Sequence, residues 1–212
     1  MADLILCPVS FGELFDKISI LDIKKKYITN ISKRSDIENE FNILINYIQN
    51  KIIEHKYLYD LLFKINEDIW NLMDSIRIIN TNINKESWID LCKKTLDYND
   101  IRFRIKNKIN YICNSSIKEH KGYTPSVYSI LYTNYNLTKF KILIMYKSIM
   151  CDNVYIYCNS DNYSILKEEF KSDSTINIVI DNYNNIDIDN EYNSLKNDNI
   201  FNYIHNINGE YV

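Results

Sequence analysis

Apolar residues recur at steps of three and four over most of the first 113 residues. The clearest run alternates the two steps without a break, at Leu58, Leu62, Ile65, Ile69, Leu72, Ile76 and Ile79. Such a heptad-like seam is typical of a helix that packs along an antiparallel partner. We place the centre of this seam at Ile69, and we expect either other helices of this chain or a second chain to cover it.

Three further amphipathic helices are predicted beside this one. Ser10 and Glu13 have the spacing of a capping box, which predicts a helix from there to about Tyr27. The others cover about residues 37–52 and 85–113. Since Gly and Pro are scarce and the period is helical throughout, residues 10–113 should be almost wholly helical, as an antiparallel bundle.

The pattern changes after residue 123. A helix over 137–150 is followed by the strand–helix–strand pattern of a β-α-β unit, with elements at 154–158, 163–170 and 176–180. We expect the run 4–7 to supply a third strand, with strands confined to residues 3–8 and to the chain after 150. From residue 181 the sequence has little period and is predicted to be loosely ordered, with Ile200-Phe201 and Tyr203-Ile204 able to dock.

The predicted fold class is therefore mainly α: an antiparallel helical bundle with a small C-terminal β-α-β appendage. The predicted domains are a helical domain, a small α/β appendage and an Asn/Asp/Ile/Tyr-rich tail, at residues 1–123, 124–182 and 183–212.

Composition narrows the function classes. The 212 residues carry a net charge of -3, which argues against a general nucleic-acid coat protein. Only 3 Gly are present, and neither common phosphate-loop motif occurs. The 38 Ile and 30 Asn indicate an AT-rich genome, and we expect a large DNA virus or an AT-rich microbe as the source.

The sequence gives little support for a metal site, for disulfide bonds or for a membrane-spanning segment. The 5 Cys and 3 His are scattered, with no C-x-x-C pair, so no metal site is predicted and no cofactor can be named. A divalent ion held by Glu13, Asp16 and Asp100 would have few ligands. Without a leader or an apolar run of membrane length, the expected setting is cytoplasmic, in the host cytoplasm or the virion if the source is viral.

The first candidate site lies at the predicted start of the first helix. Glu13 and Asp16 are candidate catalytic acids or bases, and Lys17 is a candidate ligand-binding cation. A helix N-terminus favours both acidic side chains and bound anions. The structural alternative is a capped helix with one ion pair between Glu13 and Lys17.

A second candidate lies on the fourth helix. Asn99, Arg102, Lys106 and Asn110 share one face, with Asp100 beside them. Two cations between two amides suit a carboxylate or phosphate. The alternative is a solvated surface.

Weaker signals complete the set. Glu119 and Lys121 follow the fourth helix and could fold over a pocket mouth. Asn66, Trp70, Asp74 and Arg77 share a face of the third helix, where the alternative is a packed Trp beside a surface ion pair.

Taken in order, these motifs resemble an uncharacterised intracellular domain family. It occurs in bacteria, often near surface-glycan genes, and in some large viruses. The similarity covers residues 4–123. The matching positions are Pro8, Ser10, Gly12, Glu13, Asp16, Lys17, Lys24, Asn66, Trp70, Arg77, Asn99, Asp100, Arg102, Lys106, Asn110, Glu119 and Lys121. Met73 stands where the family usually has an acid, so this chain lacks that acid if it is catalytic in the family.

We therefore expect an intracellular helical domain that binds a small anionic ligand. An enzyme of glycan or nucleotide-sugar metabolism is one form of this hypothesis, and the sequence leaves open whether the protein is an enzyme. In that hypothesis Glu13 and Lys17 lie close to Arg102 and Lys106 in one pocket, and Arg102→Ala abolishes binding with little change in melting temperature. The alternative is a non-enzymatic interaction or assembly protein that forms oligomers through the 58–79 seam. No membrane or nucleic-acid partner is expected.

Overall fold

The computed structural model describes residues 6–79, 84–122, 124–133, 135–181 and 188–211. The chain divides into two compact units, Met1–Glu119 and His120–Val212. The helices of the first unit are α1 (Phe11–Tyr27), α2 (Ile31–Glu54), α3 (Lys56–Ile78) and α4 (Lys85–Ile112). The described residues between 36 and 110 contain no strand, so the predicted helical region is confirmed.

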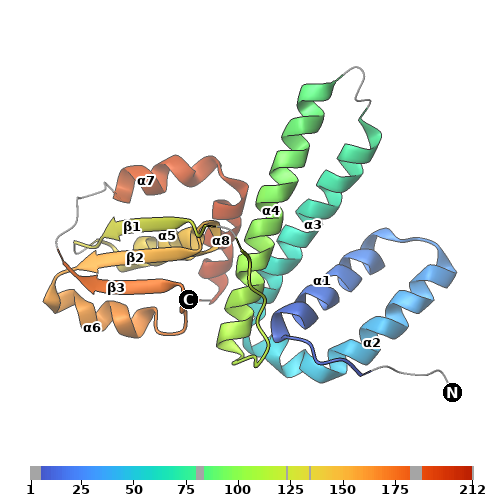
Figure 1. Ribbon diagram of the computed structural model, residues 1–212, viewed down its shortest axis with the longest axis horizontal. Coiled ribbons are helices and arrows are strands. Elements are labelled where there is room, and N and C mark those ends of the chain that lie inside the picture. The colour runs from blue at the N-terminus through green and yellow to red at the C-terminus, as the bar shows by residue number, and fades with distance from the viewer. Residues whose placement is uncertain (1–5, 80–83, 123, 134, 182–187, 212) are drawn as a thin grey trace. The chain divides into compact units, whose positions relative to one another are not determined.

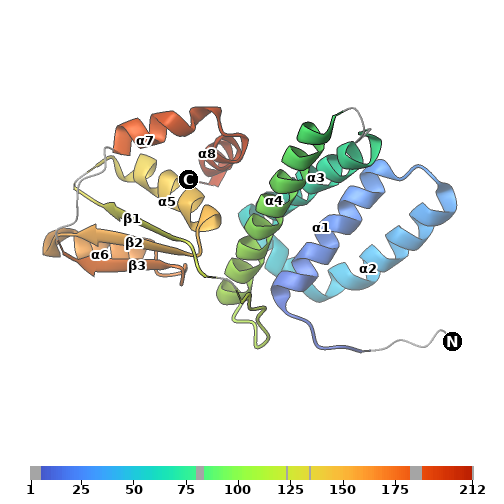
Figure 2. The ribbon, with the colours of Figure 1, turned by 45° about the horizontal axis from the view of Figure 1, so that its top comes forward.

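The first unit is built on α1 and an antiparallel α3–α4 pair (Figures 1 and 2). The side chains of Phe15, Ile18, Leu62, Ile65 and Ile105 are fully excluded from water and form its core. Along α3 the burial ends near Asn66, because Ile69 and the later seam residues are only half-buried. The predicted seam exists, but its buried centre lies about one turn before Ile69.

The second helix, α2, contributes little to this core. Ile48 is the one residue of α2 that is buried, while Ile43 and Tyr47 are exposed. Figures 1 and 2 show α2 as the antiparallel neighbour of α1 at the edge of the unit. One side of α1 is therefore covered by a single helix that buries little of its own surface.

Asparagine takes over roles that glycine and serine have in other chains. Asn30, Asn84, Asn136 and Asn159 are N-caps whose side chains accept a hydrogen bond from the third residue of the following helix. Asn114, with φ 51°, occupies the left-handed position that ends α4. Part of the Asn excess therefore has a structural use.

The second unit contains a parallel sheet in the order β1-β2-β3. Its strands are β1 (Val127–Leu131), β2 (Asn153–Cys158) and β3 (Ile176–Ile180). The helix α5 (Leu137–Met150) connects the first two strands and α6 (Ser160–Glu169) connects the last two (Figure 1). The predicted mainly α fold with a small β-α-β portion is confirmed.

Two predictions for the strands and the tail are wrong. The third strand comes from Val127–Leu131, before residue 150, whereas Leu6 and Cys7 are not in a strand and residues 4 and 5 lie outside the described residues. The tail is not loosely ordered, because α7 (Ile188–Ser194) and α8 (Asn199–Tyr211) form there. Ile200, Phe201 and Ile204 are buried, and the Phe201 ring packs edge-on against Tyr146 of α5. Those residues dock as expected.

Candidate functional site

A ladder of polar contacts joins α1 to α4. Going up α4, Arg102 contacts Asp16, Lys106 contacts Glu13, and Asn110 contacts Gly12. The α1 numbers fall as the α4 numbers rise, as they must between antiparallel helices. Sequence periodicity therefore identified the polar face of α4 correctly, and the fold places that face against the start of α1.

Asp16 and Arg102 form the most buried pair of the ladder. The Asp16 carboxylate is 5% exposed and accepts hydrogen bonds from Arg102 Nε at 2.8 Å, from Arg102 Nη2, and from Asn66 Nδ2 at 2.9 Å. Asn66 also donates to Ser19 Oγ at 2.8 Å. The hydrogen bonds to Asp16 raise the pKa of Arg102, against the effect of its burial. Both partners are therefore fully engaged.

Lys106 is shared by two acids. Its Nζ lies 2.5 Å from Glu13 Oε1 and 2.9 Å from Glu119 Oε2, and its side chain is only 10% exposed. Burial acts to lower the pKa of Lys106, but the hydrogen bonds to Glu13 and Glu119 outweigh it and raise that pKa. Glu119 thus returns to α4 and brings a second counter-charge to Lys106.

The backbone amides at the start of α1 are already occupied. Phe11 N donates to Ser115 Oγ at 3.3 Å, Gly12 N to Asn110 Oδ1 at 2.6 Å, and Glu13 N to the N-cap Ser10 Oγ at 3.1 Å. Leu14 N donates to the Ser10 carbonyl oxygen. The four amides that would attract an anion all bind protein oxygens. An anion at this helix terminus would have to displace them.

Gly12 is required where α1 crosses α4. A Cβ atom there would lie 2.5 Å from the Lys106 carbonyl oxygen and 2.9 Å from Asn110 Oδ1, so the backbones would have to move apart. We expect Gly12→Ala to lower the free energy of unfolding by about 1–3 kcal/mol. Urea denaturation measures this, with Gly122→Ala as the matched control, since a Cβ at Gly122 meets nothing within 4 Å. Equal stability of the two variants would contradict the close crossing.

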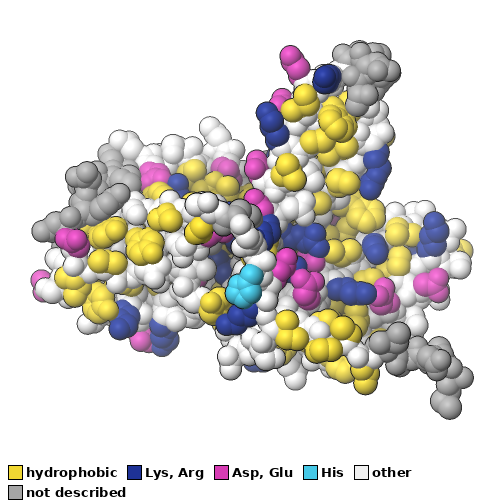
Figure 3. Space-filling model, viewed as in Figure 1, with side chains coloured by type: hydrophobic (Ala, Val, Ile, Leu, Met, Phe, Trp, Pro, Cys, Tyr) yellow, Lys and Arg dark blue, Asp and Glu magenta, His cyan; other side chains and the backbone are white. Residues whose placement is uncertain are grey.

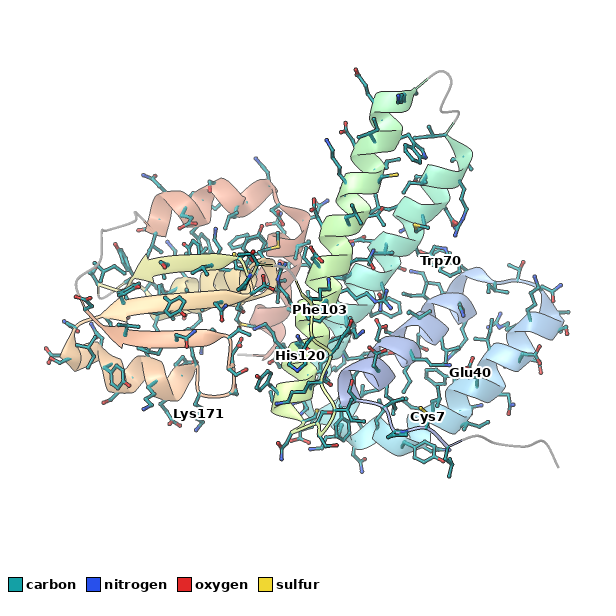
Figure 4. The ribbon with its side chains drawn as sticks, viewed as in Figure 1. Cys7, Glu40, Trp70, Phe103, His120 and Lys171 are labelled. Carbon is teal, nitrogen blue, oxygen red and sulfur yellow. The ribbon has the colours of Figure 1, made fainter. Side chains whose placement is uncertain are left out.

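A cavity of about 800 Å³ lies on the other side of α1. Its walls come from α1, from α2 and from the extended segment before α1. Cys7 in that segment and Glu40 on α2 are labelled in Figure 4. The lining residues are Leu6, Cys7, Val9, Glu13, Leu14, Asp16, Lys17, Ile20, Leu21, Lys24, Glu40, Ile43, Leu44 and Tyr47. Both candidate catalytic acids therefore face this cavity as well as the ladder.

Lys17 points to α2 and not to α4. Its Nζ lies 2.7 Å from Glu40 Oε1, and both side chains are about half exposed. The expected ion pair with Glu13 is replaced by this contact, because Glu13 binds Lys106. The single pocket predicted for Lys17, Arg102 and Lys106 is thus divided: Lys17 lines the cavity, whereas Arg102 and Lys106 are not among its lining residues.

Among the described residues, Lys24 is the cation of the cavity that has no acidic partner. It lies two turns beyond Lys17 on the same side of α1 and is half-buried. The ion pairs of the described residues engage Lys17, Lys25 and Lys26 but not Lys24. Neither Lys24 nor Glu40 was among the site residues predicted from sequence. The spacing of Lys24 from Lys17 was the signal that could have identified Lys24.

The remaining candidates are placed less centrally. Asn99 Oδ1 accepts from Arg102 Nη1 at 3.4 Å and so supports the ladder. Asp100 is half-buried on α4, and Lys121 belongs to the second unit. Trp70 stacks on Tyr27 with ring centroids 5.9 Å apart, and Asp74 and Arg77 form an exposed ion pair, as in the structural alternative.

Charges on the visible face alternate in sign. Figure 3 shows Lys and Arg next to Asp and Glu between α4 and the first turns of α1, with no large patch of one sign there. Among the side chains that the structure describes, no group of three or more His, Cys, Asp or Glu could hold a metal ion. Nor is any described helix long and apolar enough to cross a membrane.

The ladder, the capped α1 terminus and the flanking cavity all belong to the helical first unit. Residues 6–141 match a family described as "Family of unknown function (DUF6165)". The chain belongs to this family, and the match extends beyond residue 123, where the sequence resemblance ended. No curated protein and no solved structure matches the chain.

Proposed function

We propose that the first unit binds a small anionic ligand in the cavity between α1 and α2. The observation that carries this proposal is Lys24, which is half-buried, lines the cavity and has no acidic partner among the described residues. A cation that is partly withdrawn from water is stabilised by a counter-charge. A carboxylate or phosphate beside Lys24 would provide it, with Lys17 two turns away.

The ladder is a less suitable anion site than the cavity. Arg102 and Lys106 are matched by Asp16, Glu13 and Glu119, so an anion would compete with carboxylates that the fold already positions. In the proposal, Arg102 and Lys106 hold Asp16 and Glu13 in place at the cavity wall. The ligand instead binds beside the cations of α1 that line the cavity, Lys17 and Lys24.

We further propose, as the enzymatic form of this function, a reaction of glycan or nucleotide-sugar metabolism. Glu13 is the group suited to general acid–base catalysis, because its side chain is 47% exposed, lines the cavity, and shares its partner Lys106 with Glu119. Asp16 is a positioning residue in this proposal, since both of its oxygens accept hydrogen bonds from Arg102.

The test is a thermal-shift and calorimetric screen with sugar phosphates, nucleotide sugars and dicarboxylates. We expect at least one of them to raise the melting temperature of the full chain. We expect Lys24→Gln to weaken its binding by about tenfold or more, since a charge-assisted hydrogen bond contributes about 1.5–3 kcal/mol.

Lys33→Gln is the control, because it removes the same charge from an exposed site on α2 that does not line the cavity. The proposal fails if no anion in the screen binds, or if the two lysine variants bind the anion equally well.

A second candidate function is assembly through the far end of the α3–α4 pair. Leu58 and Ile65 of the seam are buried by this chain, but Leu72 and Ile79 are only half-buried. A partly covered apolar seam suits pairing with a second copy. In sedimentation equilibrium, we expect a concentration-dependent dimer that Leu72→Gln abolishes and that Ile31→Gln, at an 86% exposed site on α2, leaves intact. A monomer at every concentration would exclude this candidate.

A further inference from the structure

Lys24 and the exposed apolar side chains of the cavity lie toward opposite ends of α1. The helices α1 and α2 are antiparallel and joined by the residues 28–30, and Lys17 lies opposite Glu40. Later residues of α2, Leu44 and Tyr47, therefore lie toward the start of α1, whereas Lys24 lies toward the opposite end. At a rise of 1.5 Å per residue, Lys24 and Glu13 are about 16 Å apart along α1.

The walls near the start of α1 include the acids Glu13 and Asp16 but are otherwise apolar, and several of the apolar side chains reach into solvent. Leu6 is 88% exposed, Val9 55%, Ile43 41% and Tyr47 71%, and all four line the cavity. Neighbouring apolar side chains left in water around a concave site mark a surface that binds an apolar group. A free sugar phosphate would leave this part of the cavity unused.

We propose that the ligand is a soluble amphipathic anion, namely a single alkyl chain that carries a phosphate or carboxylate. The proposal rests on anion binding at Lys24, the first part of the proposed function, and it replaces the enzymatic form, because Glu13 lies about 16 Å from Lys24 along α1 and so beside the alkyl chain. The anionic head lies between Lys17 and Lys24. The alkyl chain runs along Ile20 and Leu14 toward Leu44 and Tyr47, where the exposed apolar side chains of the cavity border it.

Calorimetry with four probes tests this ligand class: inorganic phosphate, a hexose phosphate, octyl phosphate below its micelle concentration, and uncharged octyl glucoside. We expect octyl phosphate to bind at least about tenfold more tightly than either of the other phosphates, because even two buried methylenes suffice for that factor. Octyl glucoside, which lacks the anion, should bind more weakly than octyl phosphate.

Two pairs of variants locate the ends of the ligand. Tyr47→Ser should weaken octyl phosphate binding about tenfold and leave hexose phosphate binding unchanged. Ile53→Ser should change neither, since Ile53 is 66% exposed on the same helix but does not line the cavity. Lys24→Gln should weaken both phosphates and Lys33→Gln neither. All four sites are at the surface or half-buried, and the melting temperature of each unliganded variant checks that it is folded.

The outcomes separate this inference from the proposed function. If hexose phosphate binds as tightly as octyl phosphate, or if Tyr47→Ser and Ile53→Ser behave alike, the apolar chain is refuted while anion binding stands. If none of the anions binds, the proposed function fails. Cosedimentation with phosphatidic acid vesicles that octyl phosphate does not inhibit would indicate a membrane headgroup and overturn the soluble ligand.

Discussion

Replacing Arg102 by alanine is expected to lower the free energy of unfolding by about 3–5 kcal/mol. The reason is Asp16, whose carboxylate is 5% exposed and accepts two hydrogen bonds from this guanidinium. Without Arg102, the hydrogen bond from Asn66 is the one side-chain bond from the described residues that this buried charge keeps. In a thermal melt this corresponds to a decrease on the order of 10 °C.

This expectation replaces the one drawn from sequence, in which Arg102 was a ligand-binding residue whose loss barely changed the melting temperature. Arg77→Ala is the matched control, because Arg77 also pairs with an aspartate, but both side chains are more than half exposed. An exposed pair contributes about 1 kcal/mol or less. If the two variants lost the same stability, Asp16 would have to reach solvent once Arg102 is gone, and the buried pair would not be what stabilises the α1–α4 contact.

The second large effect is expected at Ile65. Its side chain is fully buried where α3 meets the rest of the unit, so Ile65→Ala should lower the free energy of unfolding by about 2–5 kcal/mol through lost burial and a residual cavity. Ile69→Ala should cost less, because Ile69 is half-buried. Chemical denaturation followed by circular dichroism measures both.

Ile78→Ala on the same helix serves as the control. Ile78 is 83% exposed, and its replacement should change stability by no more than about 0.5 kcal/mol. A cost at Ile69 as large as that at Ile65 would show that a partner covers the far half of the seam in solution, which would favour the assembly candidate.

The contacts of three α1 residues show why the candidate site was only partly predictable from sequence. Glu13, Asp16 and Lys17 lie within the first two turns of α1 and were expected to act together. In the structure Asp16 faces Arg102, Glu13 faces Lys106, and Lys17 faces Glu40. These three side chains lie within about 100° of one another around the helix, yet each meets a different neighbour, and only the packing of α2 and α4 decides which one.

The missed strand has a similar cause. Val127–Leu131 is rich in residues that favour strands, but it is short and follows a Thr-Pro-Ser boundary signal. Its conformation depends on hydrogen bonds to β2, with Ile130 beside Ile156 in the register. Short strands take much of their stability from pairing with distant segments, which a local pattern does not contain.

By itself, the sequence determined that the first unit is helical and where α1 and α4 begin, because the helical period and the Ser10 cap are local properties. It placed the start of α2 too late, at about residue 37 and not at Ile31. It also identified the polar face of α4. Only the tertiary structure decided that this face meets the start of α1, so that Arg102 and Lys106 are neutralised by Asp16, Glu13 and Glu119. Lys24 was left beside the cavity without an acid among the described residues, because periodicity defines a helix face and only packing selects the surface it contacts.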